Sequence, residues 1–325
     1  MSHPRTAPPS LIGPGSELGD FVLGQPIAEG ALGVLYAGVR RRDEAPVAVR
    51  VVPAERIRDD AAWRTFLESA AKAWQEERRH VAPVLGHGRL EDGTGWLASS
   101  LAEGRTLAQL LAEHPLEPSE VLAVLRGICK ALEAAHRREI FHGELTTASV
   151  CIGSDAEGRM RARVLELGGA QLLDEAKRRS GPVTRAGVAY PPFDVSRDLR
   201  ALGALTFEAL VGAPFEGEVN DDHPRVSDAR PELGAHFDTP VHALLVPGDQ
   251  PESAAAAHGL MVEAARAAGY DVGAAIPLAP REASPSAPEL STRADDPSSG
   301  KPLALVLLAG LIAAVILATL WGLLR

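Results

Sequence analysis

The chain has 325 residues, a formal net charge of −10 and a hydrophobic content of 46%. This length and apolar content suffice for a sizeable core, which excludes a disordered protein, and the acidic balance excludes a general nucleic-acid binder, because phosphate backbones are held by clustered Lys and Arg. The two cysteines, Cys129 and Cys151, have no metal-ligand or disulfide spacing, so we expect inert core residues in a reducing compartment.

The first part of the chain is predicted to be rich in strands. Residues 1–17 are rich in Pro, Ser and Gly, and we expect a flexible start without the apolar stretch of a signal peptide. Extended patterns follow in "FVLGQPIAEGALGVLYAGVR", "APVAVRVV" and "GTGWLASSLAEG". Between the second and the third, residues 59–78 have helical spacing, which places Trp63, Phe66, Ala70 and Ala73 on one side.

The second part is predicted to be mostly helical. Residues 118–139 start near Glu117, Pro118 or Ser119 and carry apolar residues at intervals of three and four: Val121, Leu125, Ile128, Leu132 and Ala135. Residues 196–215 form a helix that is apolar almost all round and therefore buried, and residues 252–270 form another. The stretch 220–233 shows no clear helical pattern.

The C-terminal part has the pattern of a membrane anchor. Residues 273–301 form a linker rich in Pro and Ser, and an uncharged run of twenty-two residues extends from Leu303 to Leu324. A helix of this length spans ~33 Å, which matches a bilayer core. We therefore expect a single-pass transmembrane helix over 302–324, with the preceding domain, 18–272, in the cytoplasm.

The order of these segments resembles the protein kinase superfamily, in particular the bacterial eukaryotic-like Ser/Thr protein kinases, over about residues 20–270. "IAEGALGVLYAG" is similar to the glycine-rich loop, "VAVRVV" to the strand of the ATP-binding lysine, "HGELTTASV" to the catalytic loop and "LELGGA" to the metal-binding segment. The resemblance implies an α+β, bilobal fold, with a β-rich N-lobe (18–103), an α-helical C-lobe (104–272), and Asp198 bracing the catalytic loop.

The nucleotide-binding positions implied by the resemblance are only partly kept. Gly30 and Gly33 remain in the glycine-rich loop, and Ser100 and Ala102 stand at the adenine-facing hinge. Arg50 occupies the lysine position, where a planar guanidinium does not fit the hole made for an ammonium, so nucleotide binding is expected to weaken or change geometry.

The resemblance also implies a helix glutamate that pairs with the residue at position 50. We predict a salt bridge between Arg50 and Glu68 that holds the lobe together without nucleotide. An alignment on Phe66 instead places Ser69 at the glutamate position.

The catalytic positions implied by the resemblance are altered together. His142 matches a structural histidine, and Glu144 replaces the aspartate that accepts the substrate proton, with its carboxylate displaced by ~1.5 Å where about 1 Å can cost a hundredfold in rate. Thr146 replaces a lysine that neutralises the transferring phosphate. Ser149 and Glu166 stand at the two Mg²⁺ positions, where the serine cannot replace an asparagine and the glutamate has a changed reach.

The leading hypothesis is a membrane-anchored pseudokinase that acts as a signalling scaffold or regulator by binding other proteins. The first alternative is a divergent, active Ser/Thr protein kinase that transfers the ATP γ-phosphate to protein hydroxyls, with Glu144 and Glu166 acting in place of aspartates. The second is a switch that binds ATP without catalysis. In the activation segment, Ser180 and Thr184 are candidate phosphorylation sites. The pattern identifies neither the partner nor the oligomeric state.

Overall fold

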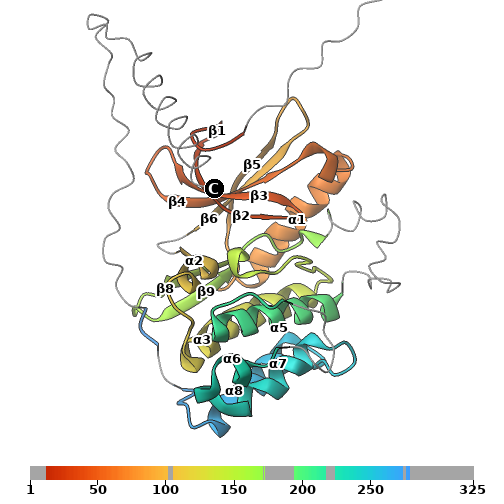
Figure 1. Cartoon of the computed structure of the whole chain (residues 1–325). Helices are drawn as coiled ribbons and strands as arrows, with labels where there is room; N and C mark the ends of the chain where they lie inside the picture. Colours follow the sequence, from red (N-terminus) through yellow and green to blue (C-terminus); the bar gives the residue numbers. More distant parts are fainter. Residues whose placement is uncertain are drawn as a thin grey trace, which may run out of the picture. The chain divides into compact units, whose positions relative to one another are not determined.

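The fold comes from a computed structural model (Figure 1), whose compact unit is Met1–Leu278. The described residues are 12–101, 105–170, 172, 194–216, 224–273 and 276–278. The predicted transmembrane helix, Ala102, Ser180 and Thr184 lie outside these residues. Within them, no helix has the length and apolar character needed to cross a membrane.

The first half of the unit is a twisted antiparallel sheet with one helix against it (Figure 1). The strand order is β1-β2-β3-β4-β6-β5. The strands are β1 Glu17–Leu18, β2 Phe21–Gly30, β3 Gly33–Arg40, β4 Pro46–Val52, β5 Val84–Arg89 and β6 Gly95–Ser100. A one-turn 3-10 helix, Ala54–Arg56, precedes helix α1, Asp60–Glu76. The strand-rich start predicted from the sequence is therefore confirmed.

Helix α1 forms because a cap and an apolar stripe coincide. The Asp59 side chain accepts a hydrogen bond from the Ala62 amide and so satisfies one of the free N–H groups at the start of the helix. All four residues predicted to share one face, Trp63, Phe66, Ala70 and Ala73, are buried.

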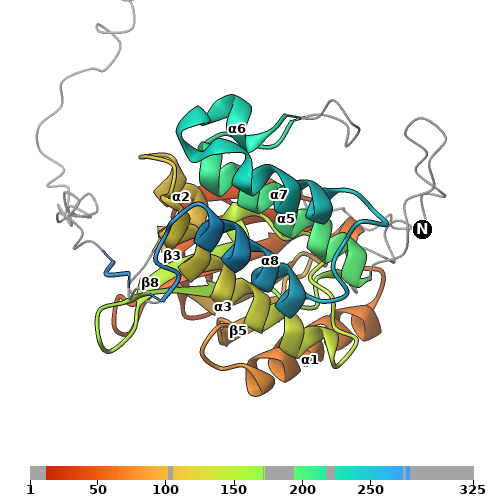
Figure 2. The same cartoon turned by 90° about the horizontal axis from the view of Figure 1, so that it is seen from below.

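The second half is mostly helical, with a small sheet at its upper edge (Figure 1). This sheet has the order β7-β8-β9. Its strands are β7 Arg105–Thr106, β8 Val150–Ser154 and β9 Met160–Val164, and the helical elements are α2 Leu107–Leu111, α3 Pro118–His136, the 3-10 turn Thr147–Ser149, α5 Val195–Val211, α6 Val226–Ala229, the 3-10 helix η3 Pro231–Phe237, α7 Asp238–Leu245 and α8 Ala254–Ala267. Seen from below, α8 lies alongside α3 (Figure 2).

The helices predicted from periodicity are present at the predicted places. Helix α3 buries all five of the apolar residues predicted for its inner stripe. Helix α5 is buried almost all round and ends at Gly212, whose φ of 81° is left-handed and stops the helix. In the described part of 220–233 there is only the single turn α6 and the start of η3, while α7 follows without having been predicted.

The core consists of several hydrophobic clusters spread over both halves. Every described core residue lies between positions 18 and 265, so residues 1–278 contain the whole described core. Cys129 and Cys151 are both buried, and burial raises the pKa of each thiol to about 12. The prediction that both cysteines are inert core residues is therefore confirmed.

Asp198, in the first turn of α5, braces the loop before β8. Its carboxylate accepts hydrogen bonds from the amides of His142 and Gly143, each at 2.9 Å, and contacts the His136 Nε2 atom at 2.9 Å. Burial acts to raise the pKa of this carboxyl, but the hydrogen bond to His136 and the neighbouring donors outweigh it, and the pKa is lowered. The bracing role expected for Asp198 is therefore confirmed.

Removal of this brace is expected to destabilise the unit strongly. In residues 1–278, Asp198→Ala leaves two buried amides without an acceptor and should lower the free energy of unfolding by about 3 to 4 kcal/mol, measured by urea unfolding. The matched control is Glu263→Ala on the exposed face of α8, which should change stability by less than about 0.5 kcal/mol. Equal effects of the two substitutions would contradict the bracing role.

Candidate functional site

The candidate site lies where four segments of the first 170 residues meet. They are the turn between β2 and β3, the middle of β4, the loop 142–149 and the loop 165–169. Each segment carries at least one of the predicted site residues, and hydrogen bonds join the four segments to one another.

Arg50 forms a buried ion pair with Glu166. The Arg50 Nε and Nη2 atoms donate to the two carboxylate oxygens of Glu166 at 2.9 and 2.8 Å, a bidentate geometry. The Nη1 atom donates to the carbonyl oxygen of Gly33 at 2.9 Å. Burial opposes the charged guanidinium, but Glu166 outweighs this effect and the pKa of Arg50 is raised. Arg50 thus ties the β2–β3 turn and the loop after β9 to β4.

The predicted salt bridge between Arg50 and Glu68 is wrong. Glu68 lies on the exposed face of α1, while the guanidinium is taken up by Glu166. Ser69, the residue of the alternative alignment, is buried and faces the loop after β9: a Cβ on Gly168 would lie 2.6 Å from the Cβ of Ser69. The helix therefore presents a small hydroxyl where the predicted ion pair needed a carboxylate.

Glu144 binds the backbone of the glycine-rich turn. Its carboxylate oxygens accept hydrogen bonds from the amides of Ala31 at 2.5 Å and of Leu32 at 3.2 Å. Successive backbone N–H groups in such a turn form a concavity that suits an anion, and here the anion is the protein's own carboxylate. The approach depends on Gly30, because a Cβ at that position would lie 2.9 Å from the Glu144 Oε1 atom.

The tip of the same turn is folded into the core. Leu32 is only 2% exposed and packs in one cluster with Phe66 and Leu172. Gly33 has a φ of +104°, and a Cβ there would lie 2.2 Å from the carbonyl oxygen of Val51. Gly33 is therefore required by its backbone conformation and by the Val51 backbone, while Gly30 leaves room for the Glu144 carboxylate.

The residues at the predicted metal positions do not fit a Mg²⁺ ion. The Ser149 hydroxyl donates to the Thr146 carbonyl oxygen at 2.8 Å and accepts from the Thr146 amide at 2.9 Å. Both oxygens of Glu166 are bound to Arg50. A divalent cation needs oxygen ligands that are free to face it, and a guanidinium beside it would be repelled.

Three more residues were singled out from the sequence: Thr146, Ser100 and His142. The Thr146 side chain is exposed and begins the 3-10 turn. Ser100 ends β6, where its amide donates to the Pro83 carbonyl oxygen at 3.1 Å. His142 is fully buried below the loop, and burial lowers the pKa of its imidazole. Its Nε2 atom has no hydrogen-bond partner among the described residues, and its Nδ1 atom lies 3.3 Å from the Glu144 amide.

Disruption of one partner of the Arg50–Glu166 pair should cost more than removal of both. In residues 1–278, Glu166→Leu leaves an unpaired buried guanidinium and should lower the free energy of unfolding by about 3 to 5 kcal/mol, measured in urea. The double variant Arg50→Met/Glu166→Leu should recover most of that loss, because no buried charge remains. If the loss in the double variant equalled the sum of the losses in Glu166→Leu and in Arg50→Met alone, the pairing would be contradicted.

Comparisons with known proteins agree with this fold. No protein-family model matches the chain. It is 30% identical over 233 residues to the serine/threonine-protein kinase PknL of Mycobacterium tuberculosis, covering 65% of this chain and 57% of PknL. It is 26% identical over 246 residues to the kinase PknJ of the same organism, covering 69% of this chain and 41% of PknJ. The chain thus spans less than two thirds of the length of either relative.

A solved structure supports the same relationship at the level of the fold. The crystal structure of a double mutant of the PknI kinase domain of Mycobacterium tuberculosis matches with a TM-score of 0.58 and 24% identity, over 78% of this chain and 99% of that domain. The matching structure shows the protein-kinase fold, and the related sequences support a relationship to the protein kinase superfamily.

Proposed function

We propose that this protein is a pseudokinase, anchored to the cytoplasmic face of a membrane and acting as a signalling scaffold that binds other proteins. The observation that carries the proposal is the position of Glu144, whose carboxylate lies on the amides of Ala31 and Leu32. In an active kinase the residue at position 144 would face a substrate hydroxyl, and the amides would face phosphate oxygens. Here the two groups satisfy each other.

The Arg50–Glu166 pair supports the same conclusion. Phosphoryl transfer depends on a cation at the phosphates and on a carboxylate at the metal ions. In this chain the residues at those two positions bind each other through two hydrogen bonds in a buried place. Separation of the pair would leave two buried charges without partners, which is strongly unfavourable.

The membrane anchor is supported by the sequence. The uncharged run from Leu303 to Leu324 has the length of a bilayer-spanning helix, and a linker of 24 residues, 279–302, separates it from the end of the compact unit. A tether of this kind keeps the kinase-like unit close to a membrane while leaving its surface free for partners.

A switch that binds ATP without transferring phosphate is the second candidate. The amides of Ala31 and Leu32 favour it, because they form an anion-binding turn in which the bound anion is only the Glu144 carboxylate. A nucleotide phosphate could compete with Glu144 for them. An active kinase would be revealed by transfer of the ATP γ-phosphate from the native chain to a protein acceptor.

The purified full chain in detergent should show no transfer of the ATP γ-phosphate to itself or to a generic protein acceptor, with Mg²⁺ or Mn²⁺ present. The matched comparison is a variant with the ordinary kinase residues restored: Arg50→Lys, Glu144→Asp, Thr146→Lys, Ser149→Asn and Glu166→Asp. Labelling by the native chain that disappears in Glu144→Ala would overturn the proposal in favour of an active kinase.

The Glu144 contact should also weaken nucleotide binding. In thermal unfolding of residues 1–278 with ATP, Glu144→Ala is expected to bind ATP at least ~10-fold more tightly than the native sequence, because the competing carboxylate is gone. Glu68→Ala removes an exposed acid of α1 and is the matched control, which should behave as the native sequence does. Tight ATP binding by the native sequence would favour the nucleotide switch.

A further inference from the structure

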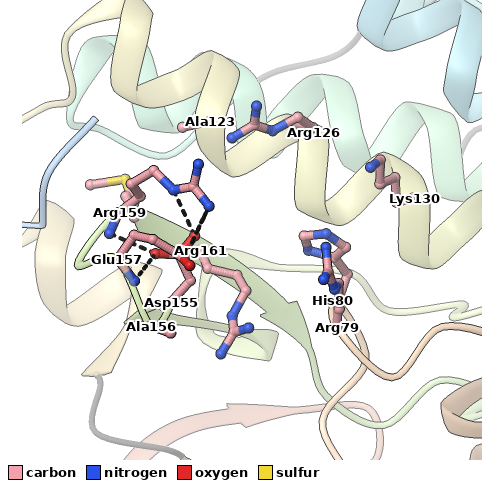
Figure 3. Close-up of a pocket in the computed structure, with 11 residues that line it drawn as sticks. Arg79, His80, Ala123, Arg126, Lys130, Asp155, Ala156, Glu157, Arg159 and Arg161 are labelled. Atoms are coloured by element: carbon pink, nitrogen blue, oxygen red, sulfur yellow. Dashed lines mark hydrogen bonds and ion pairs between the residues drawn. The ribbon is translucent and has the colours of Figure 1, made fainter. Parts of the chain in front are cut away.

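A basic pocket lies on the second half of the unit, outside the kinase-like site. It has a volume of about 390 Å³ and lies between α3, the β8–β9 hairpin and the segment before β5 (Figure 3). Five cationic side chains and two carboxylates line it: Arg79, Arg126, Lys130, Arg159, Arg161, Asp155 and Glu157. The lining therefore has a formal excess of three positive charges, in a chain whose net charge is −10.

Strand periodicity places arginines on the outer face of β9. Met160, Ala162 and Val164 are buried against the core, so the alternate residues, Arg161 and Arg163, point outward. Arg161 pairs with Gly153 on β8, where the absence of a side chain leaves room beside the guanidinium. A second hollow of about 440 Å³ opens there and shares Arg161 with the first.

Helix α3 adds two cations from above. Arg126 and Lys130 are exposed and four residues apart, so they lie on the same side of the helix (Figure 3). Like charges at this spacing repel each other. Gly127 brings this side of the helix close to β9, because a Cβ there would lie 2.8 Å from the Ala162 carbonyl oxygen.

The two carboxylates do not neutralise these cations. Asp155 and Glu157 both bind Arg159, with their nearest oxygens 2.7 and 2.8 Å from its Nη2 atom. Among the described residues, the side chains of Arg79, Arg126, Lys130 and Arg161 have no carboxylate within ion-pair distance. His80 adds no charge at neutral pH, because burial, together with Lys130 and Arg161, lowers the pKa of its imidazole.

We propose that this pocket binds the phosphate group of an anionic ligand. Guanidinium groups present planar forks of N–H donors that match phosphate oxygens, and three of the four cations without a carboxylate are arginines. The mutual repulsion of Arg126 and Lys130 on α3 is relieved when an anion lies beside them. An apolar ligand would leave the guanidinium groups desolvated and unpaired, and a cation would be repelled.

The chain leaves the compact unit at the rim of this pocket. The Met160 amide donates to the Ile276 carbonyl oxygen at 2.7 Å, and the Leu278 amide donates to the Gly158 carbonyl oxygen at 3.1 Å. The 24 residues from 279 to 302 then lead to the apolar run. If the proposed anchor is correct, this rim is the part of the unit tethered to the bilayer, which favours a lipid headgroup as the source of the phosphate.

The first test uses inorganic pyrophosphate and residues 1–278, which contain the whole described core. Pyrophosphate at saturating concentration should raise the unfolding midpoint by about 3 °C or more at low salt. Arg126→Gln/Lys130→Gln should weaken its apparent affinity at least ~10-fold, and the loss should shrink at higher salt. Arg64→Gln/Lys72→Gln, which removes the same charge from the exposed face of α1, is the matched control and should keep the full shift.

The second test separates the two sources of phosphate. The same proteins are sedimented with vesicles of phosphatidylcholine, with or without about 30% phosphatidylglycerol. Binding only to the anionic vesicles that is lost in the Arg126/Lys130 variant identifies a lipid headgroup. A pyrophosphate shift without vesicle binding identifies a soluble phosphate compound. The pocket proposal is overturned if neither ligand distinguishes the pocket variant from the control, and this outcome leaves the kinase assay, and hence the pseudokinase proposal, unaffected.

Discussion

The buried ion pair between Arg50 and Glu166 is the interaction on which the arrangement of the kinase-like site depends. It joins β4 to the loop after β9, and through the Gly33 carbonyl oxygen it also holds the β2–β3 turn. A buried charge persists only when its donors and acceptors are all satisfied, so each member of the pair requires the other. The same two side chains stand at the positions that would meet a phosphate and a metal ion. Structural pairing and phosphotransfer chemistry therefore need the same two charges, and in this chain both charges are engaged in the ion pair.

The Glu144 contact extends this competition to the backbone. The turn amides of Ala31 and Leu32 retain the geometry of an anion site, yet the anion is supplied from within the chain. The retention of Gly30 and Gly33 consequently has an internal cause, since a side chain at either position would meet Glu144 or the Val51 carbonyl oxygen. Family motifs kept in a sequence can thus reflect the packing of the scaffold. Asp198 is the clearest case, because all its contacts are to the loop and helix that it braces.

Local patterns predicted the elements well and the long-range pairs poorly. Helices α1, α3, α5 and α8 follow from apolar periodicity and from caps such as Asp59, which are short-range signals. The partner of Arg50 was missed because it lies 116 residues away, and because a shift of one residue on α1, from Ser69 to Glu68, turns a side chain from the buried face to the exposed one. The sequence did carry one signal for the Arg50–Glu166 pair. Arg50 stands where the resemblance implies a lysine and Glu166 where it implies an aspartate, so both side chains are longer and can reach each other. Helix α7 was missed because it is short and contains Pro240.

The distribution of charge separates the inherited site from the rest of the surface. Among the described residues of the kinase-like site, the cation Arg50 is matched by a carboxylate and the carboxylate of Glu144 is matched by amides, so little electrostatic free energy is left there for a ligand. Around α3 and the β8–β9 hairpin the reverse holds, because Arg126, Lys130 and Arg161 line one pocket without a carboxylate partner among the described residues. A ligand recognised by charge gains most where charges are unmatched before it binds. If the pocket binds phosphate as proposed, recognition by charge is expected there rather than at the Arg50–Glu166 pair.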